Sequence, residues 1–292
     1  MHAPSANGST IASFSSSSVV ASWVTSMTLI ASPRHPLSLA LAPKGPNAHP
    51  PHVPLACGER EKLQVIMGDI GVQYHALKIF QLNTAKVTAS GNALARIMGA
   101  HRHSLAFITE PPIAFNKVCG FPAGAFNVLH HPKEVKRCRA AIVASKGVDV
   151  MALPAYTDED TVSAITSLDG KDTCIVSTYM DIKSNKVPEM VHKVAHYAAV
   201  SGYGLLICTD ANAHSPLWGS PDINQRGKLI EEDLIYRYGL QLLNVGASPT
   251  YIGHLTIAGT IIDLTLATHR TAASLSSWEV SDKVVLSDHS LI

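Results

Sequence analysis

A carboxylate, a carboxamide and an imidazole stand at alternating positions within Cys208–Ser220, directly after a short apolar run. That run, Gly204–Cys208, is aliphatic and too short for a helix, which predicts a buried strand. If the extended geometry continues, its period of two places Asp210, Asn212 and His214 on one face. An aspartate can orient a water or hold a metal and an asparagine amide can bind an anionic oxygen, which suits phosphate chemistry. The same Asp-x-Asn pattern is also typical of turns, because both side chains hydrogen-bond nearby backbone.

Further polar residues follow, or interrupt, other apolar runs: Asn83, Glu110, Asp263 and Ser287–His289. Polar groups gathered at strand ends are where layered folds place their active sites. A lone glutamate after a strand is usually a surface charge, so Glu110 carries little weight by itself. Asp263 carries more, because a buried carboxylate needs a partner, and His289 is a candidate for that partner. The final triplet follows residues 284–286, which we expect to form a strand.

The elements that must position these residues alternate along the chain. Period-two patterns and short apolar runs predict strands at 75–82, 105–108, 139–144, 173–179, 205–208 and 260–267. Helical spacing predicts helices over 84–98, 188–200 and 224–238. The last helix has a stop signal in Gly239, a residue that suits the left-handed position after a helix. This alternation predicts a layered α/β or α+β domain.

Length, net charge and composition limit the domain organisation and the partners that this chain can have. The 292 residues suffice for one large domain with a tail or for two small domains, and a net charge of +1 gives no global sign of a nucleic-acid partner. Residues 1–62 are rich in Ser, Ala, Pro and His without sustained periodicity, so we predict that they are disordered and that residues 63–292 form the folded domain. The apolar stretch 10–32 is broken by serines and resembles neither a signal peptide nor a spanning helix, so we expect no membrane partner.

Taken together, the order of these motifs resembles the exonuclease-endonuclease-phosphatase superfamily, which includes apurinic endonucleases and pancreatic deoxyribonuclease. The motifs are Asn83, Thr109–Pro111, Ser177–Tyr179, Asp210-x-Asn212, Ile262–Leu264 and Ser287–His289. Within the superfamily, residues 77–292 resemble the endonuclease domain of non-LTR retrotransposon polyproteins, on segments 212–220, 224–227, 243–246, 249–251 and 261–267. The resemblance implies a four-layered α/β sandwich of the DNase I type, in which two facing mixed β-sheets are flanked by helices.

The resemblance also implies a metal site. Glu110 would hold a divalent cation, Mg²⁺ or alternatively Mn²⁺, since both suit oxygen ligands. Asn83 would support that metal and contact the phosphate, and Asp288 would lie beside the metal.

Catalytic roles follow from the same resemblance. Asp210 would orient or deprotonate the attacking water, with Asn212 binding a phosphate oxygen beside it. Asp263 and His289 would form a carboxylate-imidazole pair in which the charged imidazole binds and stabilises a pentacovalent phosphate. Either Asp210 or His289 fits the role of general base. Tyr179 would hydrogen-bond the scissile phosphate, although without the surrounding motifs an ordinary core tyrosine would be the better interpretation.

The function implied is a metal-dependent endonuclease that nicks double-stranded DNA and leaves a 3′-hydroxyl to prime reverse transcription, which would place it in the nucleus. A reverse transcriptase domain is expected in the parent polyprotein, whereas this sequence stops at Ile292, so we expect a fragment whose final motif frays. Two alternatives stay open. One is a phosphatase or phosphodiesterase of the same superfamily with a non-DNA substrate; the other is an inactive DNA-binding remnant of a retrotransposon.

Overall fold

The structure, a computed structural model, divides into two compact units, Met1–Tyr74 and His75–Ile292. It describes residues 27–29, 39–41, 52–53, 76–131, 138–253 and 259–292. In the first unit these residues form a small antiparallel sheet of β1 (Met27–Leu29), β2 (Leu39–Leu41) and β3 (His52–Val53). The remainder of the segment 1–62, predicted to be disordered, lies outside the described residues, as does the predicted boundary at residue 63.

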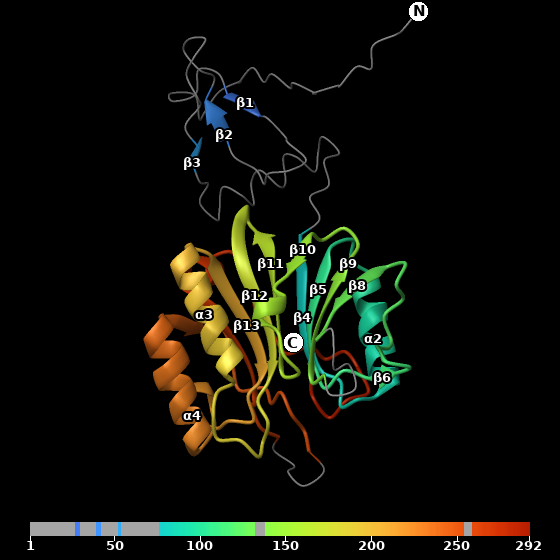
Figure 1. Cartoon of the computed structure of the whole chain (residues 1–292), viewed down its shortest axis with the longest axis vertical. Coiled ribbons are helices and arrows are strands. Elements are labelled where there is room, and N and C mark those ends of the chain that lie inside the picture. The colour runs from blue at the N-terminus through green and yellow to red at the C-terminus, as the bar shows by residue number, and fades with distance from the viewer. Residues whose placement is uncertain (1–26, 30–38, 42–51, 54–75, 132–137, 254–258) are drawn as a thin grey trace, which may run out of the picture. The chain divides into compact units, whose positions relative to one another are not determined.

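Two mixed β-sheets form the centre of the second unit (Figure 1). The larger has the order β10 (Val150–Ala152), β11 (Thr161–Leu168), β12 (Lys171–Tyr179), β13 (Gly204–Asp210), β15 (Asp263–Thr268) and β14 (Leu240–Leu242). The smaller has the order β4 (Lys78–Asn83), β5 (Ser104–Thr109), β9 (Ala140–Ser145) and β8 (Phe126–Leu129). Strands β4 and β5 are parallel, as are β12 and β13, and the other pairs are antiparallel.

Helices and short elements complete the second unit. The helices are α2 (Thr88–Gly99), α3 (Glu189–Ser201), α4 (Gln225–Ile230), its π-helical continuation η4 (Glu231–Tyr236) and α5 (His269–Ala272). Two 3₁₀ turns, η2 (Pro154–Tyr156) and η3 (Pro216–Trp218), and a hairpin of β6 (Ile113–Ala114) and β7 (Lys117–Val118) lie in the connections. Among the described residues, no helix is both long and apolar enough to cross a membrane.

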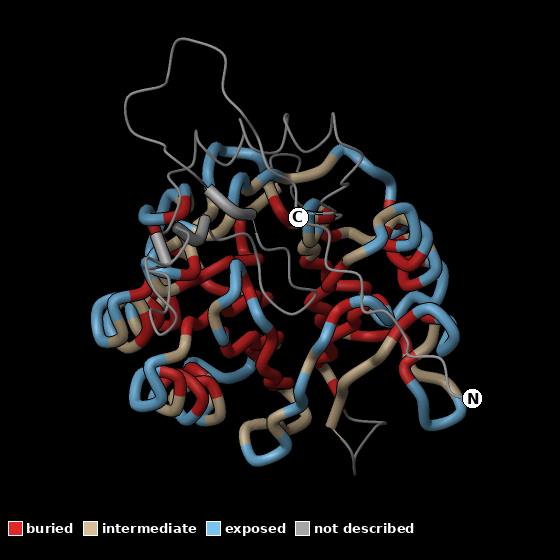
Figure 2. The backbone as a smooth tube through the Cα atoms, turned by 90° about the horizontal axis from the view of Figure 1, so that it is seen from above, coloured by how far each residue is buried: buried red, intermediate tan, exposed pale blue. Residues whose placement is uncertain are grey.

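The core forms in layers. Along β5, Phe107 belongs to the cluster between the two sheets, whereas its neighbour Ile108 belongs to the cluster under α2, as the period of two requires. Both faces of this strand are therefore buried, which explains why its inner residues 105–108 are all apolar. The larger sheet packs its other face on α3 through Val191 and Val194. Figure 2 shows the buried strands in the interior and the exposed outer sides of the helices. The order helix, sheet, sheet, helix agrees with the predicted four-layered sandwich.

Each predicted strand from 75–82 to 260–267, and each predicted helix, overlaps an observed element of the same kind. Gly239 has the expected positive φ, at 62°. The prediction of a strand at 284–286 was wrong: this segment is irregular, and Leu286 has a φ of 56°. Only Val285 of the three is buried, in the cluster under α2, while Val284 and Leu286 face solvent. The buried side chain of Val285 therefore anchors this segment, although the segment pairs with no strand within the described residues.

The expectation that the final motif frays was also wrong. The Ile292 amide donates to the Gln81 carbonyl at 3.0 Å, and the Gln81 amide donates to the Ile292 carbonyl at 2.8 Å. Leu291 is buried under α2, and the Ser290 amide donates to the Thr250 carbonyl at 2.7 Å. The last residues are therefore held on the edge of β4 and against residue 250, which fixes the position of His289.

Candidate active site

Three candidate residues form a row across the larger sheet. Tyr179 and Asp210 are register partners at the ends of parallel strands β12 and β13. Asp210 is in turn opposite Asp263, the first residue of the antiparallel strand β15. Both aspartates are 2% exposed. Two buried carboxylates side by side are costly unless a cation or hydrogen bonds compensate them.

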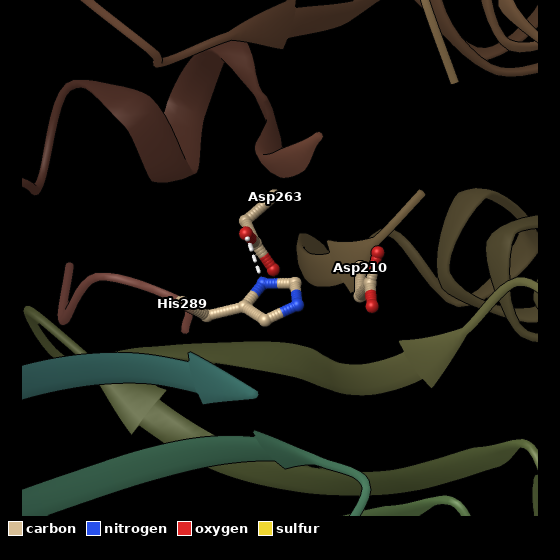
Figure 3. Close-up of side chains that lie close together, drawn as sticks. All are labelled: Asp210, Asp263 and His289. Atoms are coloured by element: carbon tan, nitrogen blue, oxygen red, sulfur yellow. Dashed lines mark hydrogen bonds and ion pairs between the residues drawn. The ribbon is translucent and has the colours of Figure 1, made fainter. Parts of the chain in front are cut away.

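His289 supplies part of that compensation. Its Nδ1 lies 2.8 Å from Asp263 Oδ2, so the predicted carboxylate-imidazole pair is formed. Ligand atoms of Asp210, Asp263 and His289 all lie within 4.8 Å of one another. Figure 3 shows one ring nitrogen of His289 against Asp263 and the other on the side of Asp210. A β-bridge pairs the backbones of His289 and Tyr251, and the centroids of their rings lie 4.8 Å apart.

Burial and the neighbouring charges shift the pKa values of Asp210 and His289. Burial and the charge of Asp263 raise the pKa of Asp210 to about 7, although His289 and a hydrogen bond from Asn83 act in the opposite direction. Burial alone would lower the pKa of His289, but the charge and hydrogen bond of Asp263 and the charges of Asp210 and Asp288 outweigh it and raise the pKa to about 9. At neutral pH the imidazole is therefore protonated and carries no lone pair for a metal.

This shift makes stability depend on pH. Because the folded-state pKa of His289 lies above its unfolded value, its contribution is complete below about pH 6.5 and is lost as the pH rises through about 9. We expect the free energy of unfolding to fall by a few kcal/mol over this interval. Urea unfolding of the full chain at several pH values measures it. The variant His289→Asn should show a flatter dependence, and an equal slope in both proteins would contradict the assignment.

Asn83 joins the smaller sheet to this cluster. Its Nδ2 donates to Asp210 Oδ2 at 2.8 Å, while its Oδ1 accepts from the Ala85 amide at 2.8 Å. The Ser287 hydroxyl donates to the Asn83 carbonyl at 2.7 Å and accepts from the His289 amide at 3.2 Å. Residues from the ends of both sheets and from the C-terminal segment thus meet at one place, as the motif order predicts.

Glu110 and Asp288, the carboxylates predicted to serve a metal, lie near the cluster. Glu110 directly follows β5, the parallel neighbour of the strand that carries Asn83, and has a φ of 45°. The Lys86 ammonium lies 2.9 Å from Glu110 Oε1. After burial, Glu110 and Asp210 are the next causes that raise the pKa of Tyr179, to about 12, so both carboxylates lie within electrostatic range of this phenol. Asp288 lies beside the cluster, since its charge acts on the adjacent imidazole.

The residues present fit a divalent cation. The carboxylates of Glu110, Asp210 and Asp288 provide oxygen donors, which hard cations such as Mg²⁺ prefer. Asp263 Oδ1 is buried and has no hydrogen-bond partner within the described part of the chain. Asp210, Asp263 and His289 by themselves satisfy the spacing of a metal-binding group, but the protonated imidazole argues for a cation on the Glu110 side instead.

The face predicted for Asp210, Asn212 and His214 is not formed. The strand ends at Asp210, and Asn212 has a φ of 44°, so the alternation of side chains stops there. The Asn212 amide nitrogen Nδ2 donates to the Met180 carbonyl at 3.0 Å, and its backbone amide donates to Asp210 Oδ1 at 3.2 Å. His214 is instead 3.3 Å from Asp222 and partly exposed. Asn212 therefore stays beside the cluster, while His214 takes no part in it.

Arg226 is a positioning residue to which no role was assigned from the sequence, although it lies in the motif 224–227. It is 2% exposed. Its Nη1 donates to the carbonyls of Met180, Ala211 and Asn212 at 3.0–3.2 Å, and its Nη2 donates to that of Asp181. The guanidinium thus ties the segment after Tyr179 to the segment after Asp210.

The helix that carries Arg226 can approach this closely because of Gly227. A Cβ at this position would lie 2.0 Å from the His214 carbonyl oxygen. The Asn224 side chain begins the helix by accepting from the Gly227 amide at 2.8 Å. Asn224 and Gly227 therefore place Arg226 under the two segments that it joins.

Replacing Arg226 with Met should destabilise the protein by about 3 kcal/mol, because several buried carbonyls would lose their donor. Arg226→Lys should fall between the parent and Arg226→Met, since one ammonium cannot reach both segments. Urea unfolding of the full chain measures the difference. Arg237→Met, at an exposed arginine directly after η4, is the matched control and should cost less than about 0.5 kcal/mol. Equal losses for both sites would contradict the positioning role.

Arg139 holds the outer side of Tyr179. Its guanidinium lies 5.0 Å from the centre of the Tyr179 ring and is paired with Asp160 and Asp181 at 2.5 Å. In the sequence, Arg139 lies close to Lys133, Lys136 and Arg137 and could form with them a basic patch for a DNA backbone, but two carboxylates neutralise Arg139. The other three residues lie outside the described part of the chain.

Gln81 is a second unassigned contributor. Its Nε2 donates to the carbonyls of Thr209 and Leu264, and its Oε1 accepts from the Thr265 hydroxyl at 2.9 Å. This buried amide hydrogen-bonds the smaller sheet to the strands that carry Asp210 and Asp263. Its alternation with apolar neighbours in the sequence would by itself suggest a solvent-facing residue, because the partners that bury it lie more than 100 residues away.

Comparisons with known proteins agree with this architecture. The structure resembles the endonuclease domain of TRAS1, a telomere-specific non-LTR retrotransposon, with a TM-score of 0.62 and 22% identity over 74% of this chain and 96% of that one. It also resembles AP endonuclease LMAP from Leishmania major, with a TM-score of 0.54 and 13% identity over 76% of this chain and 88% of that one. No match to the sequence is found among curated proteins.

The fold is therefore that of the DNase I-like endonucleases, a class of α/β proteins with two facing mixed sheets. Residues 173–292 match the family described as Endonuclease-reverse transcriptase. This segment contains Tyr179, Asp210, Asp263 and His289. The resemblance to endonuclease domains of non-LTR retrotransposons is thus confirmed, and the segment that matches the Endonuclease-reverse transcriptase family carries most of the candidate site.

Proposed function

We propose that this chain is a divalent-metal-dependent endonuclease that hydrolyses one phosphodiester bond of double-stranded DNA and leaves a 3′-hydroxyl for target-primed reverse transcription. The main support is the meeting of Asp210, the Asp263–His289 pair and Asn83 at the ends of both sheets, within a chain whose second half matches an endonuclease family. The expected partners are duplex DNA and, in the parent polyprotein, a reverse transcriptase. The nucleus is the compartment where that substrate lies.

Each residue has a role that its surroundings favour. Asp210, with a pKa of about 7, is ionised in a useful fraction at neutral pH and fits the general base that takes the proton of the attacking water. His289 is protonated and its free ring nitrogen can donate to a phosphate oxygen as negative charge develops there. These protonation states favour Asp210 over His289 as the base. Tyr179 keeps its phenolic proton, because its pKa is about 12, and can donate it to the phosphate in a hydrogen bond.

The metal side completes the proposal. Glu110, Asn83 and Asp288 would hold Mg²⁺ or Mn²⁺, which when bound supplies positive charge that polarises the scissile phosphate. Asn212 supports a phosphate oxygen from the opposite side, although its amide now donates to the Met180 carbonyl and would have to share or leave that bond. Arg226 fixes the backbone of this residue while the side chain changes partner.

A plasmid-nicking assay with the full chain tests the proposed function. Supercoiled DNA should convert to open-circular DNA in Mg²⁺ but not in EDTA, and end labelling should find a 3′-hydroxyl at the nick. A folded chain that leaves the plasmid intact but hydrolyses bis(p-nitrophenyl) phosphate would favour the phosphodiesterase alternative. A folded chain that binds DNA and cleaves neither substrate would favour the inactive remnant.

Metal binding provides a separate measurement. Glu110→Gln should weaken Mn²⁺ binding about 10-fold, which reduces metal-induced stabilisation by about 1.4 kcal/mol at saturating metal. Thermal unfolding of the full chain at increasing Mn²⁺ measures this effect. Glu189→Gln is the matched control, because Glu189 also pairs with a lysine, at 2.8 Å, but lies on the exposed face of α3. If both variants respond to Mn²⁺ like the parent, Glu110 does not hold the metal.

A further inference from the structure

The hairpin of β6 and β7 displays an almost wholly exposed aromatic side chain. Phe115, at the tip, is 98% exposed. Large aromatic side chains gain stability by burial, so an almost wholly exposed phenylalanine contributes little to folding. Isolated exposed apolar residues are common, however, and exposure alone assigns nothing.

The backbone at this tip is a second, independent observation. Phe115 and Asn116 have φ values of 52° and 57°, so both central residues of the two-residue turn are left-handed. Turns of this kind favour Asn and Gly, and a bulky side chain at a positive φ costs about 1–2 kcal/mol. Phenylalanine thus stands at a position where an asparagine would be both more stable and more soluble. Strain of this sort clusters at functional sites.

The hairpin is rigidly held at its base. The Cys119 amide donates to the Pro112 carbonyl at 2.8 Å, and Val118 is buried in the cluster under α2. Gly120, with a φ of 93°, approaches Gly91 of α2 so closely that a Cβ would lie 2.8 Å from the backbone of that helix. Figure 1 shows β6 beside α2. The tip is therefore presented by a fixed support and not by a free loop.

The short distance along the chain from Phe115 to Glu110 suggests which ligand the hairpin would meet. Only four residues separate Phe115 from Glu110, so the two lie at most about 18 Å apart, the length of about five base-pair steps. No acidic residue occurs from 111 to 133, and Asn116 and Lys117 beside the tip are exposed. A phosphate backbone placed at Glu110 would thus pass within reach of an apolar ring, an amide and an ammonium, without a carboxylate on the hairpin to repel it.

We propose that Phe115 is a DNA-contacting wedge that stacks on, or inserts between, bases of the duplex near the cleaved bond, with Asn116 and Lys117 contacting the backbone. Apolar side chains inserted at base steps bend or unstack the duplex, and base–aromatic stacking does not depend on one particular base. The wedge would therefore contribute affinity and select deformable steps for cleavage. It rests on the proposed function, because its substrate is the same duplex.

Phe115→Asn in the full chain separates binding from folding. Because asparagine suits a positive φ, this variant should unfold at the same or a higher temperature than the parent, yet bind a 30-base-pair duplex in EDTA about 10-fold more weakly by fluorescence anisotropy. Phe115→Trp should keep the affinity. Val200→Ala, an exposed apolar residue at the end of α3, is the matched control and should leave binding unchanged.

Two further readouts distinguish the wedge from the nuclease. The parent should change the fluorescence of 2-aminopurine placed within the duplex, and Phe115→Asn should not. Equal affinities and equal 2-aminopurine signals for the parent and Phe115→Asn would overturn the wedge, even if the parent nicks DNA. A parent that shows the expected difference in binding but does not nick in Mg²⁺ would support the wedge and overturn the proposed nuclease.

Discussion

His289→Asn is expected to lower the rate of Mg²⁺-dependent nicking by the full chain about 10³-fold. The imidazole is fixed at 2.8 Å by Asp263, and its pKa of about 9 keeps it protonated where the phosphate gains charge. Asparagine retains a polar side chain of similar reach but carries no positive charge. The initial rate of conversion of supercoiled plasmid at saturating Mg²⁺ measures the loss.

The pH dependence gives this prediction a sharper form. The parent's rate should decline as the pH rises through about 9, because His289 loses its proton, and the residual rate of His289→Asn should not show this decline. The double variant His289→Asn/Asp263→Asn should be about as slow as His289→Asn alone, since the two residues act as a unit. His214→Asn is the control: this histidine pairs with Asp222 outside the cluster. A normal alkaline decline in His289→Asn would assign that decline to another group.

The sequence predicts the layers of this fold well because both faces of the central strands are buried. Residues 105–108 of β5 and 140–144 of β9 are apolar at each position, and such runs can be recognised without knowing their partners. The segment 284–286 looks similar but is held by one buried valine. Local pattern cannot distinguish these cases, because the difference lies in whether a neighbouring strand is present.

The site residues likewise divide into those that the local sequence pattern predicts and those that it does not. Asp210, Asp263 and His289 were identified because polar residues at strand ends meet when strands are neighbours, and the resemblance fixed their order. Arg226 and Gln81 had no such signal, since their partners are backbone carbonyls of segments distant in the chain. Asn212 shows the reverse error: the period of two does not continue past the end of β13, because a positive φ at Asn212 breaks the alternation of side chains.

Asp210→Asn should be the most damaging single change to catalysis, lowering the nicking rate about 10⁴-fold by removing the proposed base. The carboxylate is buried next to Asp263, and its raised pKa shows that the folded protein keeps this group at an energetic cost. Duplex binding in EDTA should be as tight as the parent's or tighter, because the substitution removes a negative charge that repels the phosphate.

This combination separates chemistry from binding. Asp222→Asn is the matched control, an exposed aspartate 12 residues further along, and should nick at the parent's rate. If Asp210→Asn nicks within about tenfold of the parent, another group takes the proton, and His289 would then be the base despite its raised pKa. If it instead loses duplex binding together with nicking, Asp210 holds the site in shape through Asn83 and the Asn212 amide rather than acting on water. The loss of rate with retained binding is the result expected if the reaction requires the ionised form of this buried carboxylate.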